Sequence, residues 1–296
     1  MFTGLSAFPL TPMQDDAVDE AAFACLVERL AASDVDSIAV LGSTGSYAYL
    51  SPGERRRVVQ LAAANTGSKP LIVGVGALRT SEVLANVRAA EDSGAAGILL
   101  APVSYQALTD GDVYGLFRDV TDATDLPVII YDNPGTTHFT FSTELYGQIA
   151  ALPGIASIKI PPVTAAAAAG RVSAVRAVIP DHVTIGISGD AAAADGLNAG
   201  CDAWYSAVAG TLPEPALAIL RAAREGRPHD AAAESARLAP LWELFAEHGS
   251  LRVIAAVAEH LGFAPRNCLP RPLRGLDAED RRRVAGVVDA LGFTAG

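Results

Sequence analysis

The stretch Ile155-Ala156-Ser157-Ile158-Lys159-Ile160-Pro161 is a short, mostly apolar run, and an alanine-rich helical pattern follows it near 164–178. A nearly continuous apolar run is typical of a strand that is covered on both faces, because a strand with one solvated face alternates apolar and polar residues. Seven further runs of this kind lie at 5–10, 37–42, 71–76, 97–102, 127–133, 183–189 and 203–208. The chain therefore repeats one strand–helix unit.

Helical patterns separate these runs and set the architecture. They lie near 19–32, 52–65, 80–93, 109–123, 142–151, 164–178, 190–199 and 213–225. Several begin with capping signals, such as Ser51-Pro52 before Glu54. Eight such units match a closed parallel barrel. A doubly wound open sheet usually carries a glycine-rich fingerprint after its first strand, and the run at 5–11 has none. The sequence predicts an α/β fold, a (β/α)8 TIM barrel.

The alternation stops after about residue 226. Helical patterns near 229–247, 250–261 and 277–291 follow, interrupted by Gly262 and by a proline-rich stretch at 265–272. We predict a catalytic barrel over residues 1–225 and a small C-terminal helical extension over residues 226–296, packed on the barrel.

Composition excludes several classes of partner. The formal net charge of −11 argues against nucleic acid and anionic membranes, since both need a basic surface. Cys25, Cys201 and Cys268 lie far apart without C-x-x-C spacing, which is typical of reduced thiols, and the five histidines show no metal-binding spacing. The N-terminus lacks the pattern of a signal peptide or a membrane span. We expect a cytoplasmic protein without a metal.

Lysine is rare in this chain, and one lysine stands in an apolar strand. Only two of the 22 basic side chains are lysines: Lys69 lies in a polar turn, whereas Lys159 lies inside the run quoted above. Burial disfavours the charged ammonium and lowers its pKa from about 10.4, which an amine nucleophile needs at neutral pH. Lys159 is therefore a candidate nucleophile at the carboxyl end of a barrel strand. The alternative is a lysine that pairs with a carboxylate inside the barrel.

Several short motifs, each weak by itself, together resemble one family. In chain order they are Phe8-Pro9-Leu10-Thr11-Pro12, Gly42-Ser43-Thr44-Gly45, Leu50-Ser51, Glu54-Arg55, Tyr131-Asp132-Asn133-Pro134, Ile158-Lys159 and Ser188-Gly189-Asp190. Their order and separations resemble the dihydrodipicolinate synthase / N-acetylneuraminate lyase family along almost the entire chain. The resemblance implies class I aldolase chemistry, in which Lys159 attacks the ketone of a small 2-oxo acid such as pyruvate. No cofactor is implied, because the iminium itself is the electron sink.

The resemblance also implies roles for other residues. Tyr131 would relay protons together with Thr44, since a phenol both donates and accepts hydrogen bonds. Ser43 and Thr44 would hold the substrate carboxylate with their hydroxyls and backbone N–H groups, and Gly189 and Tyr205 would line the pocket. A structural glycine-rich turn, and an aromatic residue that only fills the barrel mouth, are the alternatives. Because the family is commonly tetrameric, we expect a homo-oligomer, a tetramer or a dimer.

The sequence departs from the family at the positions that select the second substrate. Thr136 stands where dihydrodipicolinate synthases carry an arginine, and threonine cannot provide a bidentate cationic clamp. Tyr105 alone remains of a usual tyrosine pair. Ala191 and Ala192 replace the acidic pair of sialic acid lyases, and Pro161 replaces a hydroxyl residue.

Three functions follow from these patterns. The first is a Schiff-base-forming lyase or aldolase that acts on pyruvate or a 2-keto-3-deoxy acid, with an unassigned second substrate. The second is 4-hydroxy-tetrahydrodipicolinate synthase, which condenses pyruvate with aspartate semialdehyde. The third, from another class, is a non-catalytic 2-oxo acid sensor.

Overall fold

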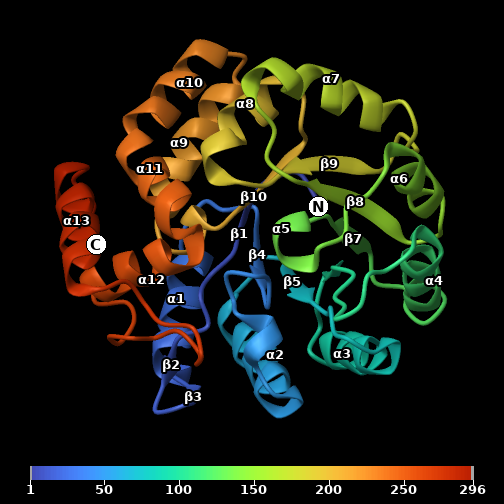
Figure 1. Cartoon of the computed structure of the whole chain (residues 1–296), viewed down its shortest axis with the longest axis horizontal. Helices are drawn as coiled ribbons and strands as arrows, with labels where there is room; N and C mark the ends of the chain where they lie inside the picture. Colours follow the sequence, from blue (N-terminus) through green and yellow to red (C-terminus); the bar gives the residue numbers. More distant parts are fainter. Residues whose placement is uncertain (1, 295–296) are drawn as a thin grey trace.

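The computed structural model describes residues 2–294, and in this part eight parallel strands form a closed barrel (Figure 1). The strands are β1 (Gly4–Ala7), β4 (Ser37–Val40), β5 (Leu71–Gly74), β6 (Gly97–Leu100), β7 (Val128–Tyr131), β8 (Ile155–Ile160), β9 (Thr184–Ile187) and β10 (Ala203–Ser206). Each strand pairs with the next one along the chain, and β10 closes the ring on β1. The predicted (β/α)8 TIM barrel is confirmed.

All eight predicted strands form, but each ends one to three residues earlier than its apolar run. The apolar residues beyond the strands stay buried: Phe8, just after β1, and Leu41, just after β4, are each 2% exposed. Apolar sequence at the carboxyl ends of the strands therefore continues into the loops that cover the barrel mouth.

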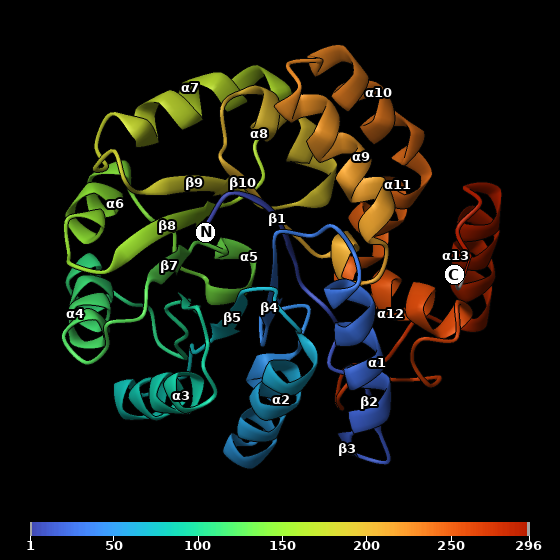
Figure 2. The same cartoon turned by 180° about the vertical axis from the view of Figure 1, so that it is seen from behind.

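The helices that connect the strands lie around the outside of the barrel, as Figures 1 and 2 show from opposite sides. They are α1 (Glu20–Ala31), α2 (Pro52–Asn65), α3 (Thr80–Asp92), α4 (Asp110–Thr121), α6 (Thr143–Ala150), α7 (Ala165–Arg176), α8 (Ala193–Asn198) and α9 (Pro213–Arg224). At the start of α2, where a cap was predicted, Ser51 and Glu54 form a reciprocal capping pair.

The loops contain short elements that the apolar pattern did not predict. They are the hairpin β2 (Met13–Gln14) and β3 (Ala17–Val18), the single turn α5 (Pro134–Thr137), and the 3₁₀ turns η1 (Tyr47–Tyr49), η2 (Asp190–Ala192) and η3 (Val208–Gly210). Two-residue strands and single helical turns are too short to show a hydrophobic period.

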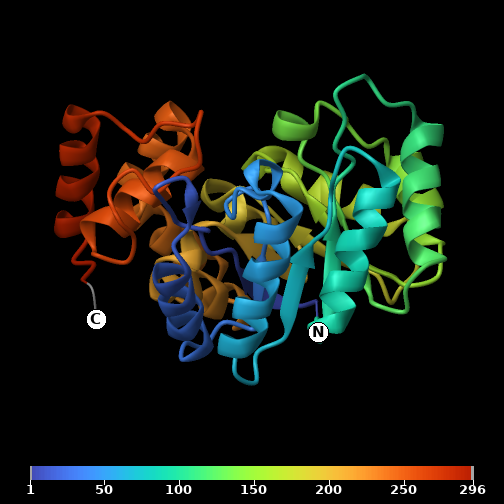
Figure 3. The ribbon, with the colours of Figure 1, turned by 90° about the horizontal axis from the view of Figure 1, so that it is seen from below.

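The C-terminal part is helical, with α10 (Pro228–Arg237), α11 (Ala239–His248), α12 (Ser250–His260) and α13 (Ala278–Ala290). The single helix expected at 229–247 is wrong, because the chain breaks at Leu238 into α10 and α11. Pro240 lies in the first turn of α11, where its missing N–H is tolerated, whereas inside one long helix it would remove a backbone hydrogen bond. Figure 3 shows these orange and red helices at one side of the barrel.

Two hydrophobic cores build the molecule. The outer core lies between the strands and the helices, and it includes residues of the C-terminal helices such as Val253 and Val284. The inner core lies inside the barrel and consists of Phe2, Phe8, Ala39, Ile72, Leu99, Ala101, Ile129, Tyr131, Ala203 and Tyr205. Among residues 2–294, no helix is both long enough and apolar enough to cross a membrane.

Candidate active site

Lys159 lies near the carboxyl end of β8, with its side chain inside the barrel. In the sheet register it stands opposite Tyr131 of β7 and Gly186 of β9. The side chain is buried, and its Nζ lies 4.0 Å from the centre of the Phe8 ring and 4.2 Å from that of Tyr131. The amine is therefore enclosed by aromatic faces at the mouth of the barrel.

This environment changes the protonation of the amine. Burial lowers the pKa of Lys159 from 10.5 to about 7, and the nearby Asp190 carboxylate opposes part of that change. The oxygens of Asp190 are engaged elsewhere: they accept from Trp204 Nε1 at 3.1 Å, Ser206 Oγ at 2.8 Å and the Val208 amide at 2.9 Å. A large fraction of Lys159 is consequently neutral at neutral pH, as a nucleophilic amine requires.

The hydroxyl of Tyr131 points into a small polar group. Ser43 Oγ lies 3.1 Å from Tyr131 Oη, and Asn133 Nδ2 donates to the same oxygen at 2.8 Å. Asn133 Nδ2 also lies 3.4 Å from Ser43 Oγ. Burial raises the pKa of Tyr131, while these two hydrogen bonds lower it, and the phenol is neutral at physiological pH.

The loop that carries Ser43 and Thr44 follows β4 and packs directly on Phe8. A Cβ at Gly42 would lie 2.6 Å from the Phe8 ring, so glycine permits this close approach. Ser43, which is half-buried, contacts Tyr131, and the next residue, Thr44, is buried. The structure thus brings Lys159, Tyr131 and this loop together, with Ser43 as the hydroxyl that hydrogen-bonds Tyr131.

Tyr205 packs below Lys159. Its ring covers Gly186, where a Cβ would lie 2.2 Å from a ring carbon, and the ring centre lies 5.8 Å from Lys159 Nζ. Its hydroxyl is directed away from the lysine, 2.7 Å from Ser157 Oγ, to which Thr184 Oγ1 donates at 2.8 Å. Tyr205 therefore offers its ring to the neighbourhood of the lysine and satisfies its hydroxyl deeper in the barrel.

Gly189 follows β9 and has φ = +80°, a backbone conformation that favours glycine. A Cβ there would also meet Pro162 at 2.6 Å. The next residue, Asp190, is the buried carboxylate whose charge acts on the pKa of the lysine. Gly189 thus sits where the chain turns sharply beside the site.

Sequence reasoning did not assign Asn133 or Asp190 to the site. Both belong to motifs of the family resemblance. Their positions could have indicated a place in the site, because each is a polar residue just beyond the end of a buried strand, where barrels gather their functional groups. What they contact could not be read from those positions.

Thr136 and Tyr105, which stand where the sequence departs from the family pattern, are more exposed to solvent than Lys159 and Tyr131. Thr136 is exposed on α5, where its hydroxyl donates to the Asn133 carbonyl at 3.3 Å. Tyr105 is 91% exposed on the loop after β6. In the part of the chain that the structure describes, neither side chain forms a hydrogen bond with Lys159, Tyr131 or Ser43.

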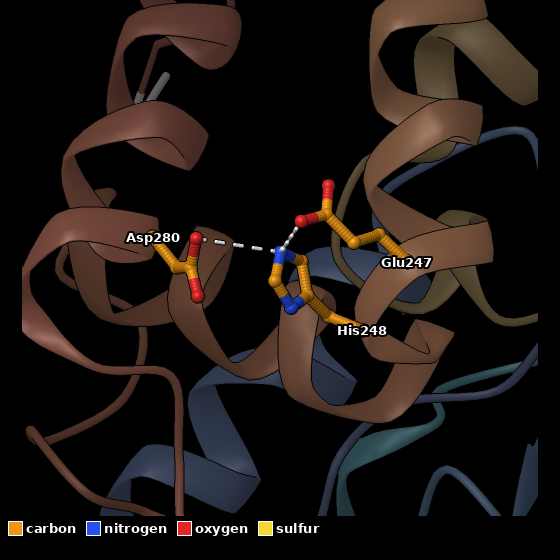
Figure 4. A group of neighbouring side chains, drawn as sticks. All are labelled: Glu247, His248 and Asp280. Carbon is orange, nitrogen blue, oxygen red and sulfur yellow. Dashed lines mark ion pairs between the residues drawn. The ribbon is translucent and has the colours of Figure 1, made fainter.

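A second cluster of ionisable groups lies far from the barrel mouth, in the C-terminal helices. Glu247, His248 and Asp280 bring one ligand atom each to within 4.8 Å of the others (Figure 4). Arg283, however, binds Glu247 Oε2 at 2.7 Å and Asp280 Oδ1 at 2.9 Å. The guanidinium already balances both carboxylates, so this cluster is an ion-pair network between α11 and α13.

Comparison with known proteins gives one consistent family. A model described as the dihydrodipicolinate synthetase family matches residues 1–291. A 4-hydroxy-tetrahydrodipicolinate synthase of Hyphomonas neptunium is 34% identical over 244 residues, which cover 80% of this chain and 81% of that protein. The corresponding protein of Gluconacetobacter diazotrophicus is 30% identical and covers 99% of this chain and 98% of its own.

Solved structures agree with these relatives. The crystal structure of dihydrodipicolinate synthase from Agrobacterium tumefaciens is 46% identical, with a TM-score of 0.95 and coverage of 98% of both chains. A structure from Pseudomonas aeruginosa, described as a putative dihydrodipicolinate synthetase, is 29% identical, with a TM-score of 0.90 and coverage of 98% of this chain and 100% of that one.

Proposed function

The chain belongs to the dihydrodipicolinate synthetase family, and on that premise we propose that Lys159 forms a Schiff base with pyruvate or a 2-keto-3-deoxy acid. Members of this family are class I aldolases and lyases, so the protein is an enzyme of that class. The observation that carries the proposal is the enclosed amine of Lys159, whose pKa burial lowers to about 7 beside the Tyr131 ring.

The neighbouring groups support a sequence of proton transfers. The neutral amine attacks the ketone and gives a carbinolamine. Tyr131 donates its proton to the carbinolamine hydroxyl, the C–O bond breaks, and water, the iminium and a phenolate result. The phenolate then takes a proton from the carbon next to the iminium, which leaves a neutral enamine and restores the phenol. The enamine carbon is the nucleophile for aldol addition, and the reverse sequence gives cleavage.

We assign the carboxylate of the 2-oxo acid to the loop after β4. Ser43 and Thr44 supply hydroxyls there, and the loop backbone supplies N–H groups, which together can hold an anion without a fixed cation. Gly189 and the ring of Tyr205 form the adjoining walls of this proposed pocket. The protein needs no cofactor in this scheme, because the iminium accepts the electrons.

Borohydride trapping tests the covalent step. Pyruvate with borohydride should add one reduced pyruvyl group to the protein, and peptide mapping should place it on Lys159. The chain provides a matched control, since Lys69 is its only other lysine. Lys69→Ala should trap normally and Lys159→Ala should not. An unchanged protein mass, or label on Lys69, contradicts the proposal.

The residue at position 136 bears on the identity of the second substrate. Because Thr136 stands at the position of the arginine clamp, we propose a less charged aldehyde or a 2-keto-3-deoxy acid as the partner of the enamine. The curated relatives, named 4-hydroxy-tetrahydrodipicolinate synthase, favour aspartate semialdehyde as the alternative. Pyruvate release from a panel of 2-keto-3-deoxy acids, measured beside direct condensation of pyruvate with aspartate semialdehyde, separates the two. Membership in a family of enzymes leaves the non-catalytic sensor without support.

We also propose a homo-oligomer, a tetramer or a dimer. Three large apolar side chains are exposed on the loops after neighbouring strands β4, β5 and β6: Tyr49 (47%), Leu78 (65%) and Tyr105 (91%). Exposed apolar groups that gather on one face favour association. Light scattering after size-exclusion chromatography gives the mass in solution, and Tyr105→Asp should lower it if this face is the interface.

Two broader assignments complete the proposal. We place the protein in the cytoplasm, where its three thiols would stay reduced.

We divide the chain into the barrel, 1–225, and the helical extension, 226–296, which shares the outer core with the barrel. A fragment of residues 1–225 should therefore be poorly soluble, and a stable, folded fragment would contradict this dependence.

A further inference from the structure

Asn133 reaches the hydroxyl groups of both Tyr131 and Ser43. It stands two residues after Tyr131, just beyond the end of β7, and its Nδ2 lies 2.8 Å from Tyr131 Oη and 3.4 Å from Ser43 Oγ. An amide nitrogen carries two N–H groups and only donates. One side chain can therefore occupy a lone pair on each hydroxyl oxygen while each hydroxyl keeps its own proton.

The backbone around Asn133 is held in place before any substrate binds. Its carbonyl accepts from the amides of Thr136 and Thr137, both at 3.0 Å, and from the Thr137 hydroxyl at 3.1 Å. Pro134 begins the turn α5 directly after it. Restricting the backbone in this way reduces the freedom of the amide side chain and keeps it aimed at Tyr131.

We propose that Asn133 is a positioning residue that directs the proton of Tyr131 toward the substrate bound to Lys159. The inference rests on the proposed Schiff-base function. With the amide as donor on one side of Oη, the phenol proton can point to Ser43 or to the carbinolamine hydroxyl, but not back to Asn133. When that proton leaves, the same N–H stabilises the phenolate, which next removes the proton from the carbon beside the iminium.

The electrostatics of the site agree with this role. Burial raises the pKa of Tyr131, and its hydrogen bonds with Ser43 and Asn133 lower it. A buried phenolate without a donor is unfavourable, because it loses its hydration without compensation. The amide of Asn133 is a donor that cannot itself lose a proton, so it stabilises the anion without competing for the proton being transferred.

Hydrogen–deuterium exchange at the methyl group of pyruvate tests the proposal without the second substrate. The exchange, followed by proton NMR in D2O, measures passage between iminium and enamine. In Asn133→Leu we expect the maximal exchange rate to fall by about 10²-fold. The pyruvate concentration that gives half-maximal borohydride trapping should stay unchanged. Asn198→Leu, at an exposed asparagine on α8, is the matched control and should exchange like wild type.

Asn133→Asp decides the direction of the hydrogen bond. A carboxylate can only accept, so it would hold the phenol proton and repel the phenolate, and exchange should be slower than in Asn133→Leu. Faster exchange in Asn133→Asp than in Asn133→Leu would overturn the proposal, because the amide oxygen would then be the group that faces Tyr131. Parallel loss of trapping and exchange would also overturn it, as a purely structural role. No adduct in the wild-type protein would instead refute the Schiff-base function itself.

Discussion

The inner and outer cores of this barrel are formed by opposite faces of the same strands but differ in composition and in role. The outer core is a continuous layer of mostly aliphatic side chains between strands and helices. The inner core contains Phe8, Tyr131 and Tyr205, and it encloses the amine of Lys159. The large apolar area of the outer layer stabilises the fold, so the inner residues can hold groups that burial disfavours.

The inner core handles its polar groups in two ways. Below the lysine, the hydroxyls of Tyr205, Ser157 and Thr184 satisfy one another through hydrogen bonds of 2.7 and 2.8 Å. At the mouth, the Lys159 amine has aromatic faces around it, and burial lowers its pKa. These three hydroxyls are paired with one another, whereas the amine at the mouth is kept ready to react.

Lys159→Met should have the largest effect on chemistry. We expect complete loss of the trapped pyruvate adduct, because methionine has similar length but no nucleophile. Intact-protein mass spectrometry after borohydride treatment measures this. An adduct of normal yield in the variant would show that another residue is the nucleophile.

Lys159→Met should also be more stable than wild type, so the lysine that is needed for adduct formation lowers the stability of the fold. The folded-state pKa of Lys159 is lowered to about 7, so between pH 7 and pH 10.5 the unfolded state binds more protons than the folded state. The buried lysine therefore lowers the free energy of unfolding by on the order of 4 kcal/mol at and below pH 7. This loss disappears as the pH rises toward 10.5. Urea unfolding of both proteins at pH 7 and pH 10 tests this; a less stable variant at pH 7 would contradict it.

Phe117→Ala should act on the outer core alone. Phe117 of α4 is fully buried and packs edge-on against Phe141, with ring centres 6.2 Å apart. Removing it should lower the free energy of unfolding by about 3–5 kcal/mol. The rate of adduct formation per folded molecule should not change. A large loss of rate in fully folded protein would show that the two cores are coupled.

Gly186→Ala should disturb the inner core by a smaller amount. The new Cβ would lie 2.2 Å from the Tyr205 ring, so that ring must move and weaken its bond to Ser157. We expect a loss of about 1–3 kcal/mol in stability, together with slower adduct formation. Gly170→Ala on the open surface of α7 is the control and should stabilise the protein by about 0.5–1 kcal/mol. If the two variants had the same stability and the same rate of adduct formation, Tyr205 would not contribute to the site.

The mildest test changes only the pH. Below the pKa of Lys159 the neutral amine decreases about tenfold for each pH unit, and the initial rate of adduct formation should follow it. The rate should reach half of its plateau near pH 7, where burial places the pKa of Lys159. Rapid quenching with borohydride across pH 5 to 9 measures the curve. A midpoint near 10 would mean that the amine is solvated and that the inner core does not tune it.

Much of the fold could be predicted because its signals are local. The apolar runs located all eight strands, and the serine before α2 located a helix start. The hairpin of β2 and β3 escaped because elements of two residues have no period, and α10 and α11 appeared as one helix because the pattern continued across Leu238. Local patterns thus identified elements more reliably than their ends.

The sequence by itself determined the barrel and the nucleophile candidate, because an apolar strand and a rare lysine inside it are features of a few adjacent residues. Only the tertiary structure decided what surrounds that lysine. Ser43 and Tyr131 are 88 residues apart, yet their hydroxyls lie 3.1 Å from each other. That contact depends on the stagger of strands around the barrel, and a slip of one residue would turn Tyr131 or Lys159 out of the interior. The contact of Asn133 with Ser43 and the pairing of Asp190 with Trp204 and Ser206 come from the same stagger, which no local pattern records.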